Sequence, residues 1–204
     1  MKKMIKTICF DFGGVYVHSR RHTWKDNWKY YQKFIGKKFT YSIYCEHQKL
    51  LDTGKTDLRE HWQNIFNEIN LSNPKLFNKL IKHKPKKHKI KKNIHNLVLK
   101  LKKRGFNVVL ISNTIKPSAK SNRERGYYKV FDKLFLSSEV GFSKSDDSLY
   151  KFVLKNLKLK ASECVAIDDN PDFLGEASKL GMNVIHFKNA KQVETELKNL
   201  GLDF

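Results

Sequence analysis

The stretch ICFDFGGV, residues 8–15, decides the fold, because an apolar run ends there at Asp11 and two glycines, Gly13 and Gly14, follow at once. A carboxylate at the carboxyl end of a buried strand lies where open α/β sheets bind their ligands. Glycines beside it allow the backbone to bend and to approach a ligand closely. The stretch therefore predicts a first strand, over residues 5–12, with a ligand-binding carboxylate at its end.

Further polar groups follow later in the chain, each directly after an apolar run or just before a helix. Because the carboxyl ends of parallel strands gather at one edge of a sheet, we expect these groups to converge on Asp11. Carboxylates, a hydroxyl and a lysine at one place are suited to Mg²⁺-assisted phosphoryl transfer. The groups are Ser112-Asn113, Lys144 and Asp168-Asp169.

The second half of the chain alternates between strand and helix patterns. Such alternation predicts an α/β fold with a doubly wound parallel sheet. The expected strands cover 106–111, 133–136, 164–167 and 183–187. One helix is expected to begin at Pro117, and three more are expected over 147–157, 171–180 and 191–200. Ser145 or Asp146 is the expected N-cap of the helix over 147–157.

Residues 22–83 differ from the rest, since they are rich in aromatic residues, helical in period and show no clear strand pattern. A lysine-rich connector, 82–92, follows and leads into a helix whose apolar stripe runs from Ile94 to Leu101. Trp24 and Trp28 recur at helical spacing, which is typical of a packed helix face. The helices expected in this part cover 22–35, 41–52, 57–69 and 74–83.

The composition is that of a folded globular protein, with 204 residues of which 40% are hydrophobic. No apolar run approaches the roughly 20 residues that a membrane-spanning helix needs. The basic start, residues 1–6, imitates a signal peptide, but Asp11 interrupts the apolar stretch behind it, so a cytoplasmic protein is expected. Cys9, Cys45 and Cys164 show no metal-ligand spacing, and we expect reduced thiols.

The net charge of +21 predicts an affinity for anions. The lysines are spread over the whole chain, however, and no recognised nucleic-acid-binding module accompanies them. A small phosphorylated metabolite is therefore the expected partner, nucleic acid is a weaker expectation, and no membrane association is expected. We expect a monomer or a homodimer.

The residues support a specific chemistry. Asp11 can attack a phosphorus atom to form an aspartyl-phosphate, which water then hydrolyses. Mg²⁺ prefers oxygen ligands, and Asp11 with Asp168 and Asp169 supplies them. Lys144 would neutralise the phosphoryl group and keep Asp11 ionised, and the Ser112 hydroxyl would donate a hydrogen bond. Each group also has a purely structural explanation as a turn former, a helix cap or a solvated lysine, but their combination in this order favours one common site.

These motifs together resemble the haloacid dehalogenase-like hydrolase superfamily, in particular its branch with an Asp-Phe-Gly-Gly-Val motif, which includes phosphatases similar to glucose-1-phosphatase. The resemblance implies a Rossmann-like core, residues 1–16 and 89–204, with an inserted α-helical cap at 17–88. It also implies a Mg²⁺-dependent phosphatase. The implied catalytic residues are Asp11, Ser112 and Lys144; the phosphate-binding residues are Ser112, Asn113, Gly14 and Lys144; and the metal ligands are Asp11, Gly13 through its carbonyl, Asp168 and Asp169.

Three positions depart from the family pattern. Gly13 stands where most phosphatases of the family carry a second aspartate as general acid and base, a role that typically contributes 10²–10⁴-fold to the rate. His18 is a candidate substitute. Phe173 replaces an Asn or Asp that helps to hold the lysine, and Ser145 replaces the proline after it.

Three functions remain open at this point. The leading one is a phosphatase with a cap that selects the substrate, for which Tyr16, His18 and Arg20 are candidate pocket residues. The second is a catalytically weak or inactive phosphate- or RNA-binding protein of the same fold, which Gly13, Phe173 and the net charge favour. The third is a haloacid dehalogenase, which needs no metal, so the presence of Asp168-Asp169 argues against it.

Overall fold

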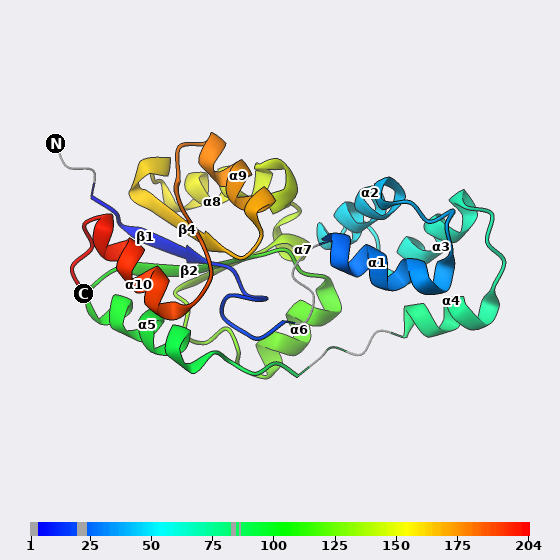
Figure 1. The fold of residues 1–204 in the computed structure, drawn as a ribbon, viewed down its shortest axis with the longest axis horizontal. Helices are drawn as coiled ribbons and strands as arrows, with labels where there is room; N and C mark the ends of the chain where they lie inside the picture. The colour runs from blue at the N-terminus through cyan, green and yellow to red at the C-terminus, as the bar shows by residue number, and fades with distance from the viewer. Residues whose placement is uncertain (1–3, 20–23, 83–84, 86) are drawn as a thin grey trace.

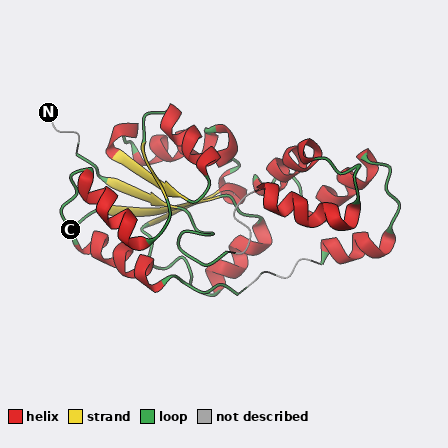
Figure 2. Ribbon diagram, viewed as in Figure 1, coloured by secondary structure: helices red, strands yellow, loops and turns green. Residues whose placement is uncertain are grey.

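The computed structural model describes residues 4–19, 24–82, 85 and 87–204, and its centre is a five-stranded sheet of order β3-β2-β1-β4-β5. All four strand pairs are parallel, as the alternating pattern predicted. Helices lie on both faces of the sheet (Figure 2), so the doubly wound α/β fold is confirmed. The strands are β1 (Thr7–Phe10), β2 (Asn107–Ser112), β3 (Lys133–Leu136), β4 (Cys164–Asp168) and β5 (Asn183–His186).

The alternation of side chains along each strand builds two cores. In β1, Ile8 and Phe10 pack on one face with apolar residues of α5 and α10, whereas Cys9 packs on the other face with α8 and α9. Figure 1 shows these two pairs of helices on opposite sides of the sheet. The helices of this part are α5 (Lys92–Lys103), α6 (Lys116–Glu124), α7 (Ser137–Val140), α8 (Ser148–Leu157), α9 (Pro171–Lys179) and α10 (Ala190–Asn199), with 3₁₀ turns η1 (Lys144–Asp146) and η2 (Ala161–Glu163).

A helical unit, residues 24–82 and called the cap below, lies beside the sheet at the right of Figure 1. Its own aromatic core contains the buried side chains of Phe39, Tyr44, Trp62 and Phe66. The connections to the core run together, since His18 N donates to Lys89 O. The helices are α1 (Trp24–Ile35), α2 (Tyr41–Asp52), α3 (Leu58–Glu68) and α4 (Pro74–Ile81).

The predicted element bounds differ from the structure in a few places. The prediction that Ser145 or Asp146 caps α8 is wrong: both belong to η1, and the N-cap is Asp147, which has a φ of 60°. The first strand ends at Phe10, although Asp11 N still donates to Ile167 O of β4. The predicted helix ends at 22 and 83, and the candidate pocket residue Arg20, lie outside the described residues.

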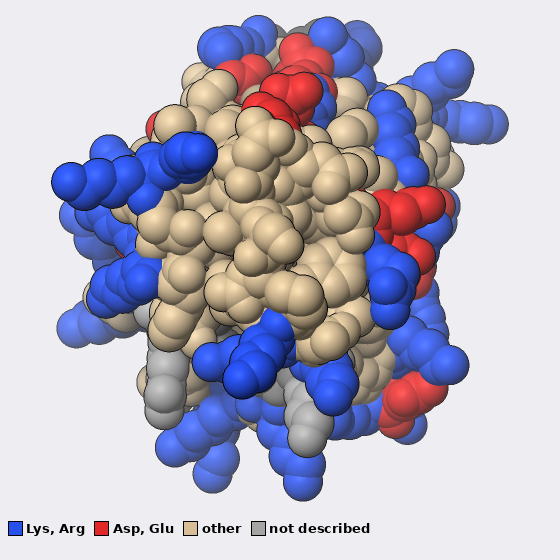
Figure 3. Space-filling view, turned by 90° about the vertical axis from the view of Figure 1, so that its right-hand side faces the viewer, with Lys and Arg blue, Asp and Glu red and all other residues tan. Residues whose placement is uncertain are grey.

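The cysteines, the apolar character of the helices and the distribution of surface charge bear on the predictions made from composition. Cys9, Cys45 and Cys164 are free thiols, as expected. Within the described ranges no helix combines the length and the apolar character needed to cross a bilayer. Seen from the cap end, lysines and arginines are dispersed around a central zone of uncharged residues (Figure 3), so this face shows no continuous basic stripe.

Candidate active site

The carboxyl ends of the central strands meet beside the cap. Phe10 pairs in register with Leu110 and with Ile167, so the residues that follow the three strands reach the same edge of the sheet. A cavity of ≈ 180 Å³ opens there. The core residues lining it are Asp11, Gly13, Ser112, Asn113, Lys144, Asp168, Asp169, Asn170 and Phe173. The structure therefore brings together the predicted catalytic, phosphate-binding and metal-binding residues with the exception of Gly14, whereas the candidate pocket residues Tyr16 and His18 do not line this cavity.

Lys144 is the centre of this group. It is 2% exposed, and its Nζ lies 2.5 Å from both Asp11 Oδ1 and Asp168 Oδ2. Burial by itself would lower the pKa of Lys144, but the charges of Asp11 and Asp168 outweigh it and raise that pKa above its ordinary value. The lysine is therefore a permanent cation between two carboxylates, and each group compensates the cost of burying the others.

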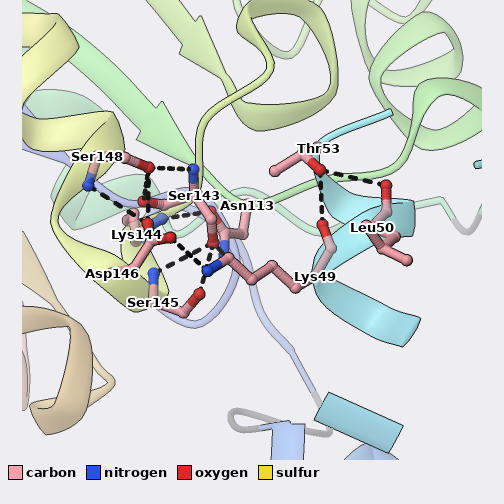
Figure 4. Close-up of polar contacts among 9 residues, drawn as sticks. All are labelled: Lys49, Leu50, Thr53, Asn113, Ser143, Lys144, Ser145, Asp146 and Ser148. Carbon is pink, nitrogen blue, oxygen red and sulfur yellow. Dashed lines mark hydrogen bonds and ion pairs between the residues drawn. The ribbon is translucent and has the colours of Figure 1, made fainter. Parts of the chain in front are cut away.

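The loop that carries Lys144 is held by Asn113. Lys144 N donates to Asn113 Oδ1 at 3.0 Å, and Asn113 Nδ2 donates to Ser143 Oγ at 3.0 Å (Figure 4). Ser143 in turn caps η1 by accepting a hydrogen bond from Ser145 N. The Asn113 side chain, predicted to bind phosphate, thus uses both of its polar atoms to position the lysine. This loop needs no proline after Lys144.

Phe173 contacts Lys144 through the face of its aromatic ring rather than through a hydrogen bond. The Lys144 ammonium lies 5.0 Å from the centroid of the Phe173 ring, which is within the range of a cation–π interaction. Trp24 of the cap packs edge-on against the same ring, with the two ring centroids 6.3 Å apart. The aromatic residue therefore helps to position the lysine and also joins the cap to the core.

Three carboxylates form a group suited to a hard cation. One oxygen each of Asp11, Asp168 and Asp169 lies within 4.8 Å of the others. Burial, reinforced by the neighbouring carboxylates and opposed by Lys144, raises the pKa of Asp11 to about 7. A divalent cation would relieve this crowding of negative groups, and an all-oxygen set fits the preference of Mg²⁺. Asp168 is already engaged, since its Oδ2 contacts Lys144 and its Oδ1 accepts from Asn170 N at 2.9 Å.

Of the two glycines that follow Asp11, only Gly13 lines the cavity. Gly13 lines the cavity, and a Cβ built on it meets no atom within 4 Å. Gly14 has a φ of 90°, donates its N–H to Val17 O, and accepts a hydrogen bond from the Lys91 ammonium. The backbone of Gly14 is thus committed to its own loop rather than directed into the cavity.

The cap contributes residues to the site that were not predicted to belong to it. Trp24, Asn27, Gln48 and Asp52 of the cap line the same cavity as Asp11, together with Ser19 of the connection to the core. No motif marks them, because their positions depend on how the cap docks on the core. A second cavity, of ≈ 760 Å³, shares four of these five residues, Trp24 being the exception. The candidate acid–base residue His18 is exposed and lines this second cavity, not the one around Asp11.

The family follows from the order of these groups and from direct comparison. The profile for haloacid dehalogenase-like hydrolases matches residues 5–174, which include the four motifs. The chain belongs to the haloacid dehalogenase-like hydrolase family. A HAD family enzyme from Bacteroides thetaiotaomicron, solved in complex with magnesium and inorganic phosphate, has the same fold, with a TM-score of 0.62, 23% sequence identity and coverage of 90% of this chain and 94% of that one.

Two phosphatases are similar in sequence to the chain. A sesquiterpene phosphatase, astK, from Aspergillus oryzae is 30% identical over 106 residues, which cover 52% of this chain and 54% of that protein. A glyceraldehyde 3-phosphate phosphatase from Methanothermobacter thermautotrophicus is 32% identical over 118 residues, which cover 54% of this chain and 51% of that protein. The matched region thus spans about half the length of either relative.

Proposed function

We propose that this protein is a Mg²⁺-dependent phosphatase that hydrolyses a small phosphate monoester through an aspartyl-phosphate on Asp11. The observation that carries the proposal is the buried Lys144 held between Asp11 and Asp168, beside a third carboxylate and a cavity. A cation and a carboxylate cluster in a confined space are suited to the accumulation of negative charge during phosphoryl transfer. The phosphatases that resemble the chain support the same chemistry.

In the proposed reaction Asp11 attacks the phosphorus atom, the bond to the leaving-group oxygen breaks, and water later releases inorganic phosphate from Asp11. Lys144 lowers the repulsion between the nucleophile and the anionic substrate. Ser112, which lines the cavity and is 5% exposed, would donate its hydroxyl to a phosphoryl oxygen. A bound divalent cation would neutralise charge on the phosphoryl oxygens.

The proposed ligands of that cation are the carboxylates of Asp11 and Asp169 and the carbonyl of Gly13. We assign Asp168 mainly to positioning, because both of its oxygens already accept hydrogen bonds from Lys144 and Asn170. The proposed division of the chain into a core, residues 1–16 and 89–204, and a cap, 17–88, gives the cap the selection of the leaving group. Its larger cavity, ≈ 760 Å³, adjoins the site and would hold that group.

The test is hydrolysis of p-nitrophenyl phosphate and of a panel of metabolite phosphates by the purified protein with Mg²⁺ or with EDTA. We expect hydrolysis with Mg²⁺, none with EDTA, and none for Asp11→Asn, whose fold is checked by circular dichroism. Activity that survives Asp11→Asn would refute the aspartyl-phosphate route. A silent panel with retained phosphate binding would instead indicate a non-catalytic binding protein.

A further inference from the structure

Asp52, the last residue of α2, lies at the junction of the two cavities. This residue lines both the ≈ 180 Å³ cavity around Asp11 and the ≈ 760 Å³ cavity between the cap and the core. A phosphate ester bound with its phosphoryl group beside Asp11 and its leaving group in the larger cavity would place the oxygen that joins them at this junction. A substrate bound in this way would have the Asp52 carboxyl beside the oxygen that separates from phosphorus.

The core holds Asp52 in place through the backbone around it. Ser137 Oγ of α7 donates to Asp52 O at 2.6 Å, and the Lys116 ammonium donates to Gly54 O at 2.9 Å. A Cβ on Gly54 would lie 2.7 Å from Ser138 O, so this turn needs glycine to approach the core so closely. One helical turn earlier, Lys49 of α2 forms an ion pair with Asp146, which lies two residues after Lys144 in η1 (Figure 4).

Asp52 is 5% exposed, and its carboxyl group accepts a hydrogen bond from Gln48 Nε2 at 2.7 Å. Burial raises its pKa to about 7, although hydrogen bonds from Gln48 and Trp24 and the charge of Lys144 act in the opposite direction. The group can therefore hold or release a proton near neutral pH. The other titratable groups that face Asp52 or line its cavities are Lys144, Tyr31, Tyr44, Asp11, Asp168, Asp169, His18, His61, Lys87, His88 and Lys89.

The other carboxyl groups that line the ≈ 180 Å³ cavity already have roles in the proposed function. Asp11 is the nucleophile, Asp168 contacts Lys144, and Asp169 is a proposed ligand of the cation. We propose that Asp52 is the general acid and base of the reaction, a role that rests on the proposed phosphatase function. This assignment places a catalytic residue in the cap, so that docking of the cap completes the site.

Asp52 alone can donate and accept the protons that the two steps of the reaction require. In the first step Asp11 forms a bond to phosphorus, the ester P–O bond breaks, and protonated Asp52 gives its proton to the leaving oxygen, which departs as an alcohol. In the second step ionised Asp52 takes a proton from the attacking water, a new P–O bond forms, and the bond between phosphorus and Asp11 breaks. Inorganic phosphate, ionised Asp11 and protonated Asp52 result, ready for the next turnover.

The experiment compares Asp52→Asn with wild type on p-nitrophenyl and p-methoxyphenyl phosphate. Nitrophenolate leaves readily without a proton, whereas the methoxyphenol oxygen needs one. We expect kcat/KM to fall by about 10²–10⁴-fold for the methoxyphenyl ester and by less than about tenfold for the nitrophenyl ester. Because the second step lacks its base, p-nitrophenyl phosphate should give a burst of one nitrophenolate per enzyme followed by slow turnover.

The matched control is Asp57→Asn, a carboxyl-to-amide change at the N-cap of α3, five residues beyond Asp52, where asparagine also caps well. It should keep wild-type kinetics. Equal losses of kcat/KM for both esters with no burst would overturn the assignment of Asp52, while the phosphatase proposal would stand if activity still requires Asp11. Failure of the wild-type protein to hydrolyse both these esters and every member of the metabolite phosphate panel would refute the proposed function, and the role of Asp52 with it.

Discussion

The ammonium group of Lys144 lies 5.0 Å from the centroid of the Phe173 ring, so an aromatic side chain contacts the catalytic lysine candidate directly. We expect Phe173→Leu to lower kcat/KM by about 2- to 30-fold, which corresponds to the loss of about 0.5–2 kcal/mol of cation–π attraction. Phe173→Tyr, which keeps the ring, should remain close to wild type in the same assay. A leucine variant as active as the tyrosine variant would contradict a positioning role for the ring.

Lys144 also contributes to folding, because it neutralises two buried carboxylates. Lys144→Met should lower the free energy of unfolding by about 3–5 kcal/mol at pH 8, as expected when one member of a buried charge group is removed. The loss should shrink at pH 5, because the pKa of Asp11 is raised to about 7 and this carboxylate accepts a proton there. Urea unfolding at the two pH values measures both effects.

Lys49→Met is the comparison for that experiment. Lys49 pairs with Asp146 at the edge between cap and core, where its side chain is 45% exposed. Because an exposed ion pair contributes about 0–1 kcal/mol, this variant should be nearly as stable as wild type. A loss at Lys49 as large as that at Lys144 would show that burial of the charge is not the cause.

His61 should make the cap sensitive to acid. Burial lowers its pKa to about 4, and its neutral ring contacts His47 O at 3.2 Å and packs edge-on against Trp62. Since the folded pKa lies below the unfolded value of 6.5, its contribution to stability is complete above pH 6.5 and is lost as the pH falls toward 4. At about 1.4 kcal/mol per pKa unit, the loss is up to about 3 kcal/mol.

Tryptophan fluorescence measures this effect specifically, because all three tryptophans of the chain, Trp24, Trp28 and Trp62, lie in the cap. The free energy of unfolding of wild type minus that of His61→Leu should decrease as the pH is lowered from 6.5 to 4. A difference that stays constant over this range would contradict a buried neutral His61.

A carboxyl group introduced at Gly13 should compensate for the loss of Asp52. Gly13 lines the cavity, its Cβ position is open, and it is not among the glycines with a positive φ, so an aspartate there meets neither a clash nor backbone strain. We expect the kcat of the double variant Gly13→Asp/Asp52→Asn to be at least tenfold higher than that of Asp52→Asn alone. Gly13→Asn in the same background is the control and should recover nothing.

Much of the fold was predictable because its signals are local. The apolar runs that became β2, β3 and β4 end within one residue of the predicted positions, and α2 matches its predicted range of 41–52. The misplaced cap of α8 has a local cause as well. Residues 144–146 form a 3₁₀ turn that displaces the start of the helix, and a sequence pattern does not distinguish such a turn from the first turn of an α-helix.

The amino-acid sequence alone determined which polar groups would meet at the edge of the sheet, because parallel strands of similar register bring their carboxyl ends together whatever covers them. Only the tertiary structure decided what faces those groups. Asp52 and Gln48 look in sequence like ordinary polar residues near the end of a helix, and Phe173 is recognisable there only as a departure from the family pattern, not as a cation–π partner of Lys144. The relation of Asp52 and Gln48 to Lys144 and Asp11 depends on how the separately packed cap docks on the core, through contacts such as Ser137 with Asp52 that join residues 85 positions apart.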